Sequence, residues 1–284
     1  MDDDRVPAAA DTRVAADETR VRAADDRVRL DFPECEIWIR ASSAMERNWR
    51  ARSCAKEPWT VDWLRNTVHA GDVLYDIGAN VGTFSLVAAR HRQARVIAFE
   101  PGYSSFARLC DNIQLNGCQH MIVPVPIPLA DKSGIFGFKY RTVDAGQSRH
   151  KLKPDTWRFR GPTPGAARYE QPVLAMTLDE LVSTFQLPEP HHLKIDVDGA
   201  EGRVLAGARR TLKSATLRSV LIEADETQWP RVVALLDKAG LALEKHIGRD
   251  KPDAPAYGLF VRRPRPRIDQ RFALWSRVRP SHGQ

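Results

Sequence analysis

The sequence predicts an α/β protein with a doubly wound, mostly parallel β-sheet, an antiparallel last strand and a small N-terminal β-hairpin. The first observation is that short apolar runs alternate with amphipathic helical patterns from residue 72 onward, which is typical of parallel strands joined by helices. The second is a glycine-rich turn between the first of these strands and its helix. The third is that the last two expected strands flank a loop of Gly, Pro and Asp residues, which suits an antiparallel pair at the end of the sheet. Ligands of such sheets bind at the carboxyl ends of the strands.

Composition excludes several classes of protein. The chain has 284 residues, of which 43% are hydrophobic and 28% charged, as in ordinary globular proteins. No apolar run approaches the roughly 20 residues needed to span a bilayer, and no apolar leader follows the acidic N-terminus. Four cysteines without a CxxC pair argue against a zinc knuckle or a disulfide framework. We therefore expect a reduced, cytoplasmic protein.

Both ends of the chain differ from its centre. Residues 1–27 form a charged Ala/Asp/Arg-Val extension, for which we expect a frayed or helical structure. Residues 263–284 form a basic Arg/Pro-rich tail. Seven arginines and one acid lie between Arg262 and Pro280, and they account for nearly all of the net charge of +7. Such a tail can attract phosphate, but a solvated end or a contact between copies in a homo-oligomer is the more frequent role.

The first elements expected are a hairpin and a helix. Alternating residues at 28–32 and 36–39, separated by Pro33, predict the two strands of the hairpin. Pro58 suits the first turn of a helix, and that helix ends before Gly71.

The alternating region follows. Its expected strands lie at residues 73–77, 96–99, 193–197, 217–222, 241–246 and 257–261. Its expected helices lie at 81–91, 103–116, 200–212 and 230–239, and a capping box at Thr177 begins another. Residues 141–171 are rich in Arg, Pro and Gly and have no periodicity. We expect them to form an unstructured, substrate-facing insertion.

The first strand leads into a turn that carries Asp76, Gly78, Asn80 and Gly82. Its spacing is neither that of a dinucleotide site nor that of a phosphate-binding loop. Asp76 ends the strand, where a carboxylate repels a pyrophosphate and attracts a cation. S-adenosylmethionine carries two cationic groups, a sulfonium and an ammonium. Glu100 ends the next strand and can accept both hydroxyls of a ribose.

A third group of acids, Asp196, Asp198 and Glu201, follows the strand at 193–197. Three acids at one strand end repel each other unless a cation, a proton or a substrate hydroxyl lies among them. N-capping of the next helix by Asp198 is the structural alternative, and it explains only one of the three.

Several segments, taken in order, resemble the FkbM-type S-adenosylmethionine-dependent methyltransferases. They are DIGANVGTFSLVAA, AFEP, DNIQLNG, TLDELV, KIDVDGAEGRVLAGA and SVLIEAD, with KEPWTVDWLR ahead of them. The resemblance covers residues 28–262, and Asp198 stands where many members have glutamate. It implies a class I methyltransferase fold with a Rossmann-like sheet and O-methylation of a hydroxyl on a sugar, a glycolipid or a polyketide-type small molecule.

We expect S-adenosylmethionine to lie over the turn from Gly78 to Gly82, with Glu100 on its ribose and Asp76 near its amino-acid end. Asp131, in the turn after the third strand, is expected to bind the adenine amine. Glu57 and Thr60 are expected to close over the methionine end.

Methyl transfer to an alcohol requires removal of the hydroxyl proton. Asp196 is the first candidate for the base, because neighbouring acids raise the pKa of a carboxyl group. His150 is the second candidate, because histidine titrates near neutral pH. Asp196 and Asp198 could instead share Mg²⁺, with further oxygens from Glu223 or water.

Two other classes stay open. One is an RNA or other nucleic-acid methyltransferase, although the chain lacks both the (Asp/Asn)-Pro-Pro-(Tyr/Phe) signature and a Pro-Cys nucleophile. The other is a non-catalytic protein that binds the cofactor.

Overall fold

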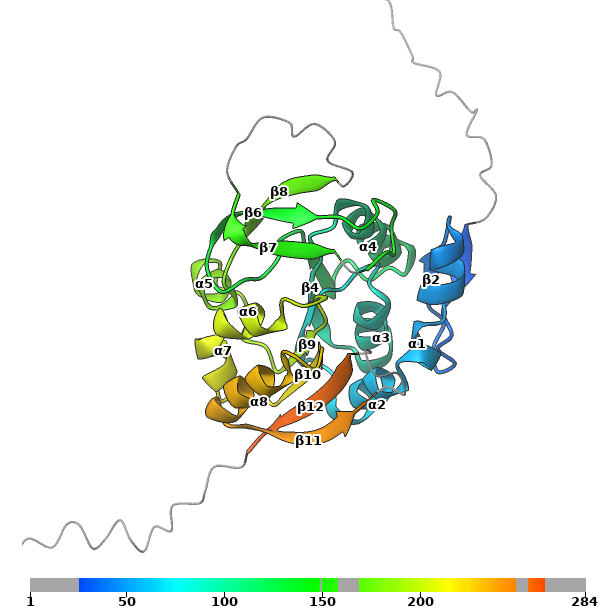
Figure 1. The fold of residues 1–284 in the computed structure, drawn as a ribbon. Helices are drawn as coiled ribbons and strands as arrows, with labels where there is room; N and C mark the ends of the chain where they lie inside the picture. Colours follow the sequence, from blue (N-terminus) through cyan, green and yellow to red (C-terminus); the bar gives the residue numbers. More distant parts are fainter. Residues whose placement is uncertain (1–25, 149, 158–168, 249–254, 264–284) are drawn as a thin grey trace, which may run out of the picture.

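A seven-stranded β-sheet forms the centre of the computed structural model, which describes residues 26–148, 150–157, 169–248 and 255–263 (Figure 1). The order of the strands across the sheet is β11-β12-β10-β9-β3-β4-β5. Neighbouring strands from β10 to β5 are parallel, whereas β12 is antiparallel to both β10 and β11. The predicted doubly wound sheet with its antiparallel last strand is therefore confirmed. The strands are β3 (Val73–Ile77), β4 (Arg95–Phe99), β5 (Ile122–Val125), β9 (His192–Ile195), β10 (Ser219–Ala224), β11 (Leu241–Ile247) and β12 (Ala256–Arg262).

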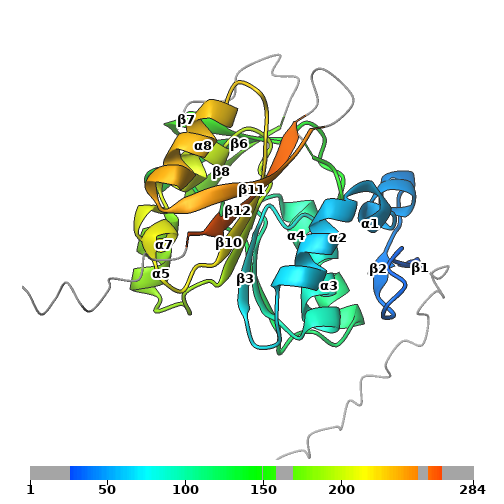
Figure 2. The same cartoon turned by 90° about the horizontal axis from the view of Figure 1, so that it is seen from below.

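Helices cover both faces of this sheet (Figure 2). One face carries α2 (Pro58–Thr67), α3 (Thr83–Arg92) and α4 (Tyr103–Leu115). The other face carries α5 (Leu178–Thr184), α6 (Glu201–Ala206), α7 (Arg209–Lys213) and α8 (Trp229–Lys238). Because both faces are covered, strands such as β3 are buried along their whole length, which explains their continuous apolar sequence.

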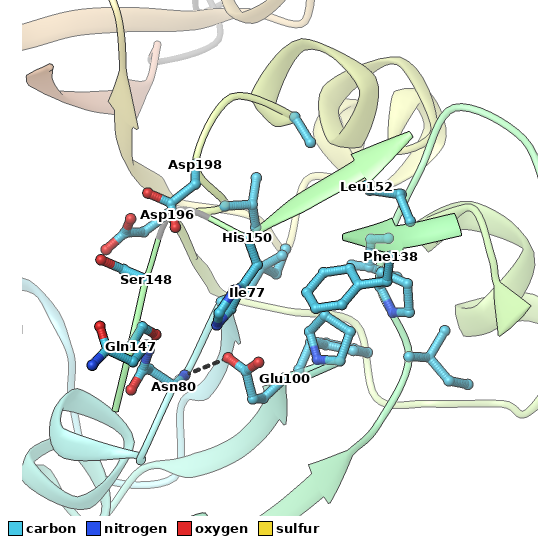
Figure 3. A pocket seen from close by; sticks show the side chains of 18 of the residues that line it. Ile77, Asn80, Glu100, Phe138, Gln147, Ser148, His150, Leu152, Asp196 and Asp198 are labelled. Carbon is cyan, nitrogen blue, oxygen red and sulfur yellow. Dashed lines mark hydrogen bonds between the residues drawn. The ribbon is translucent and has the colours of Figure 1, made fainter. Parts of the chain in front are cut away.

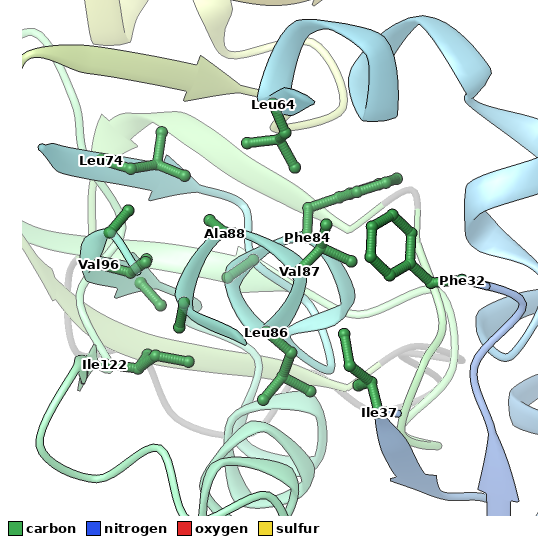
Figure 4. Packing of buried hydrophobic residues seen from close by; sticks show 14 of the residues in the cluster. Phe32, Ile37, Leu64, Leu74, Phe84, Leu86, Val87, Ala88, Val96 and Ile122 are labelled. Atoms are coloured by element: carbon green, nitrogen blue, oxygen red, sulfur yellow. The ribbon is translucent and has the colours of Figure 1, made fainter. Parts of the chain in front are cut away.

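The N-terminal hairpin packs on the outside of the first helical layer. Its strands, β1 (Arg27–Arg29) and β2 (Trp38–Arg40), pair antiparallel as predicted. Figure 4 shows Phe32 and Ile37, which lie in the link between these strands, beside apolar side chains of α3. Asn112 of α4 and Asn116, which caps the C-terminus of that helix, bind the free edge of β2: the backbone N–H groups of Trp38 and Arg40 donate to Asn116 and Asn112. The hairpin leads through η1 (Glu46–Arg50, a π-helix) and α1 (Ser53–Lys56) to α2.

A second, three-stranded antiparallel sheet stands beside the main one, in the order β7-β6-β8. Its strands are β6 (Gly134–Lys139), β7 (Lys151–Thr156) and β8 (Glu170–Ala175). The expectation that residues 141–171 have no regular structure is therefore wrong for β7 and for the start of β8. Only Leu152 of β7 packs against an apolar core. The strand has no hydrophobic alternation of its own and depends on pairing with β6.

The helix expected at 200–212 is two helices. It is interrupted at Gly207, whose carbonyl accepts a hydrogen bond from the backbone N–H of Asp179. A Cβ at Gly207 would lie 2.0 Å from the carbonyl oxygen of Ala130, so the chain passes close to another backbone there. Thr177 begins α5 as predicted, because its hydroxyl accepts a hydrogen bond from the Glu180 N–H. The reciprocal half of the predicted capping box is absent, since the Thr177 N–H donates to the Ser133 hydroxyl and not to Glu180.

The extension at 1–25 and the tail at 264–284 lie outside the described residues, and so do the expectations about them. In the part of the chain that the structure describes, no helix is long and apolar enough to cross a membrane.

Candidate active site

A cavity lies at the carboxyl ends of β3, β4 and β9, where ligands of doubly wound sheets bind. Measured out to its open mouth, the space between its walls is about 750 Å³. Figure 3 shows carboxylates on one side and the apolar side chains of Phe138 and Leu152, from the second sheet, on the other. Of the predicted site residues, six line the cavity: Gly78, Asn80, Glu100, His150, Asp196 and Asp198.

The turn after β3 depends on glycine. Gly78 has a left-handed φ of +88°, and a Cβ there would lie 1.9 Å from the carbonyl oxygen of Asp196. Gly82, at φ +86°, precedes α3, and a Cβ there would lie 2.5 Å from the Cδ1 of the Leu109 side chain in α4. Only glycine combines this conformation with such close contact. The glycine turn and the strand end that carries Asp196 are thus in direct backbone contact.

Glu100 is oriented by the same turn. Its two carboxylate oxygens accept hydrogen bonds from the backbone N–H groups of Asn80, at 2.8 Å, and Gly102, at 2.7 Å. Burial raises the pKa of Glu100 to about 7, although these two hydrogen bonds favour the charged form. Each oxygen keeps a lone pair for another donor, so Glu100 can accept two hydroxyls from the cavity.

Asp76 lies beneath the cavity instead of lining it. Its side chain is buried, and one oxygen accepts a hydrogen bond from the Ser85 hydroxyl at 2.6 Å. The other oxygen has no hydrogen bond and lies 4.0 Å from the ammonium of Lys194. Burial raises the pKa of Asp76, and Lys194 and Ser85 act against that rise. Asp76 therefore lies behind the cavity wall, where its carboxylate contacts Ser85 and Lys194 and not the cavity itself.

Lys194 is the functional residue that the sequence reasoning missed. It is 3% exposed, and its ammonium lies 3.0 Å from Asp196, whose side chain is 27% exposed toward the cavity. Burial alone would lower the pKa of Lys194, but Asp196 and Asp76 outweigh burial and raise it. The side chain is thus a buried cation shared by two carboxylates. Its place two residues before Asp196 in the KIDVDGAE segment was the available signal.

The remaining acids of that segment do not share one role. Glu201 is buried, and one of its oxygens accepts hydrogen bonds from the backbone N–H groups of Val197 and Gly199. Asp198 adopts a left-handed φ of +54° and lines the cavity. It does not cap α6, whose N-cap residue is Ala200 and has no side-chain cap. The repulsion expected among the three acids is relieved by Lys194 and by these backbone donors.

His150 enters the cavity from the segment before β7. Its Nδ1 accepts a hydrogen bond from the Arg141 N–H at 3.2 Å, so the neutral ring carries its proton on Nε2. Burial lowers the pKa of His150, and the positive charge of Arg50 lowers it further. Four residues earlier, the backbone of Gly146 is held by Arg50, and the carbonyl of Gln147 accepts a hydrogen bond from the Asn80 side chain.

Besides Asp76 and Gly82, three predicted residues do not line the cavity: Asp131, Thr60 and Glu57. Asp131 accepts a hydrogen bond from Arg203 at 2.8 Å, which joins α6 to the turn before β6. Thr60 is buried and donates a hydrogen bond to Glu57 at 3.1 Å. The charge of Glu57 nevertheless reaches Lys194, because it helps raise the pKa of that lysine.

The structure also bears on the metal alternative. Among residues 26–148, 150–157, 169–248 and 255–263, no group of three or more His, Cys, Asp or Glu side chains could hold a metal ion. The Lys194 ammonium stands next to Asp196, where a shared cation was considered. Glu223, the further oxygen donor considered, is not part of the cavity lining.

Comparison with known proteins gives one family. The family model described as the methyltransferase FkbM domain matches residues 76–243. Hexuronic acid methyltransferase AglP of Haloferax volcanii is 29% identical over 210 residues, which cover 73% of this chain and 80% of that protein. The 31-O-demethyl-FK506 methyltransferase FkbM of Streptomyces tacrolimicus is 27% identical over 187 residues, covering 60% and 66%.

A solved methyltransferase structure is also similar to this chain, at low sequence identity. The precorrin-6y C5,15-methyltransferase of Geobacter metallireducens matches with a TM-score of 0.44 and 14% identity, covering 73% of this chain and 87% of that one.

Proposed function

Because the chain belongs to the FkbM methyltransferase family, we propose that it transfers a methyl group from S-adenosylmethionine to a hydroxyl of a sugar-type small molecule. The relatives support this acceptor: AglP is named for a hexuronic acid and FkbM for an O-demethylated compound. The observation that carries the proposal is the backbone contact between Gly78 and Asp196. Through this contact the glycine turn, where the cofactor would bind, lies next to the partly exposed carboxylate of Asp196.

The residues of the cavity fit this cofactor. Glu100 has lone pairs for the two ribose hydroxyls, and Asp196 and Asp198 supply negative charge for a ligand with two cationic groups. The buried Asp76 adds to this charge from below. When bound, the cofactor supplies an activated methyl group on its positively charged sulfur.

Asp196 is the base in this proposal. It is partly exposed to the cavity, so an acceptor hydroxyl can reach it and transfer its proton to a carboxylate oxygen. Lys194 fixes the other side of the carboxylate. Once Asp196 is protonated, the ammonium of Lys194 still faces the unbonded oxygen of Asp76 at 4.0 Å. The protonation therefore leaves no isolated buried charge.

His150 is the weaker candidate for the base. The lowered pKa of its ring keeps it neutral at physiological pH. However, the nitrogen that could accept a proton already accepts the Arg141 N–H, and the Nε2–H of the ring is a donor. His150 is better suited to donate a hydrogen bond to a bound ligand.

The test is a comparison of glycans, lipids and small metabolites, by mass spectrometry, from host cells with and without the gene. We expect one compound to lose the mass of a CH₂ unit in the deletion strain and to regain it with the wild-type gene. Complementation with Asp196→Asn should leave the compound unmethylated. An unchanged profile in the deletion strain, or full restoration by Asp196→Asn, would contradict the proposal.

A further inference from the structure

Arg50 is the one lysine or arginine among the residues that line the described cavity, which otherwise contains the carboxylates of Glu100, Asp196 and Asp198. Its Nε donates a hydrogen bond to the carbonyl of Gly146 at 2.6 Å. In the described part of the chain, its terminal nitrogens make neither a hydrogen bond nor an ion pair. The fork of the guanidinium is therefore free to bind a ligand.

The position of Arg50 is built by its surroundings. It ends η1, which is anchored by the buried Glu46: this carboxylate pairs with Arg108 at 2.7 Å and accepts the Ser43 N–H at 2.9 Å. Gly146 packs on the same helix at a left-handed φ of +79°. A Cβ there would lie 3.2 Å from the Cγ of Glu46 and 3.3 Å from that of Arg50. The helix and the loop thus hold the arginine at the cavity.

The charge of Arg50 acts on groups inside the cavity. Burial raises the pKa of Glu100 to about 7, and Arg50 is among the groups that act against that rise. Burial lowers the pKa of His150, and Arg50 adds to that effect. Glu100 accepts hydrogen bonds from two backbone N–H groups and Asp196 from Lys194, and neither carboxylate pairs with Arg50 in the described part of the chain. The guanidinium fork of Arg50 therefore remains available to an anion that comes from outside.

We propose that Arg50 binds a carboxylate of a ligand in this cavity. The planar fork of a guanidinium matches a carboxylate through two parallel hydrogen bonds. The inference rests on the proposed function, under which two ligands can bring that group. One source is the amino-acid end of the cofactor, and the other is an acceptor sugar that carries a carboxylate. The chemistry recognised is the same, and binding measurements separate the two sources.

The experiment is calorimetry on wild type, Arg50→Gln and the control Arg47→Gln, which removes an exposed arginine from the same helix. Two cofactor probes are used: S-adenosylhomocysteine and 5′-methylthioadenosine, which lacks the amino-acid end. Two acceptor probes are added to protein saturated with S-adenosylhomocysteine: methyl glucuronide and methyl glucoside, which differ in one carboxylate. Thermal melting checks that each variant is folded.

Either of two results supports the proposal. If the carboxylate is the cofactor's, Arg50→Gln lowers the affinity for S-adenosylhomocysteine by about tenfold or more and leaves the affinity for 5′-methylthioadenosine unchanged. If it is the acceptor's, wild type prefers the glucuronide by about tenfold and Arg50→Gln loses that preference, with cofactor affinity unchanged. Arg47→Gln should match wild type throughout.

The proposal is overturned if folded Arg50→Gln binds all four probes as wild type does. It is also overturned if the substitution lowers the affinity for 5′-methylthioadenosine or the glucoside as strongly as it lowers the affinity for the ligands that carry a carboxylate. Failure of the proposed function looks different, because wild type then binds neither cofactor probe. That outcome would contradict the proposed function and, with it, the proposal about Arg50.

Discussion

Replacing Gly78 by alanine tests whether close contact between the glycine turn and Asp196 shapes the site. Two costs add at this position. The left-handed φ of +88° costs a residue with a Cβ about 1–2 kcal/mol. In addition, the new Cβ would lie 1.9 Å from the carbonyl oxygen of Asp196, so one of the two backbones must move. Overpacking of this kind typically costs about 1–3 kcal/mol, and the total expected loss is about 2–5 kcal/mol.

Gly71 provides the matched control. It also has a left-handed φ, +81°, but nothing lies within 4 Å of a Cβ placed there. Gly71→Ala should therefore lower the free energy of unfolding by about 1–2 kcal/mol and leave the cavity intact. Urea denaturation measures the stability of both variants, and calorimetry with S-adenosylhomocysteine measures cofactor binding.

We expect Gly78→Ala to be the less stable variant and to bind S-adenosylhomocysteine at least tenfold more weakly than Gly71→Ala does, because the turn is displaced from Asp196. Equal stability and equal affinity for the two variants would refute the reasoning. They would show that the backbones at Gly78 and Asp196 can separate freely without affecting the site.

Four further predictions concern charge. Affinity for S-adenosylhomocysteine should fall as pH drops through about 7, by up to about tenfold per pH unit, because binding favours ionised Glu100 and the free protein is half protonated at this residue near pH 7; calorimetry from pH 8 to pH 6 checks this, and Glu100→Gln should bind more weakly with a flat profile. Asp196→Asn should lower turnover by about 10²-fold or more even at saturating cofactor, whereas His150→Ala should keep more turnover; equal losses in steady-state assays would contradict the ranking. Lys194→Met should reduce the free energy of unfolding by about 3–5 kcal/mol, because the buried Asp76 and the partly exposed Asp196 lose their cation, whereas the exposed Lys213→Met should change it by less than about 0.5 kcal/mol in urea titrations. Methyl transfer should persist after dialysis against EDTA; loss of activity that Mg²⁺ restores would instead support the alternative in which Asp196 and Asp198 share a Mg²⁺ ion.

Much of the fold was predictable because the central strands are buried on both faces. A segment such as Val73–Ile77 has no exposed position, so its apolar run and its following glycine turn identify it locally. The hairpin was predictable from its alternation. The strand Lys151–Thr156 was not, because only one of its side chains packs in a core and its partner β6 is separated from it by a loop. Pairing of that kind leaves no local pattern.

The residues of the candidate site also divide into those that the sequence locates and those that only the folded structure brings there. Residues that end neighbouring strands, such as Glu100 and Asp196, could be placed together from topology alone, since parallel strands bring their carboxyl ends to one edge. Arg50 could not, because η1 reaches the cavity only through its packing on Gly146. Lys194 was visible in its segment, but its burial between two carboxylates depends on the register of β9 with β3, in which it lies opposite Asp76.

A crystal structure of the protein with S-adenosylhomocysteine tests the central claim most directly. We expect the ribose hydroxyls within hydrogen-bond distance of Glu100, the backbone of the Gly78 turn against the ligand, and its sulfur facing the part of the cavity that Asp196 lines. A ligand bound elsewhere, or bound here with its sulfur directed away from Asp196, would contradict the proposed site and its base.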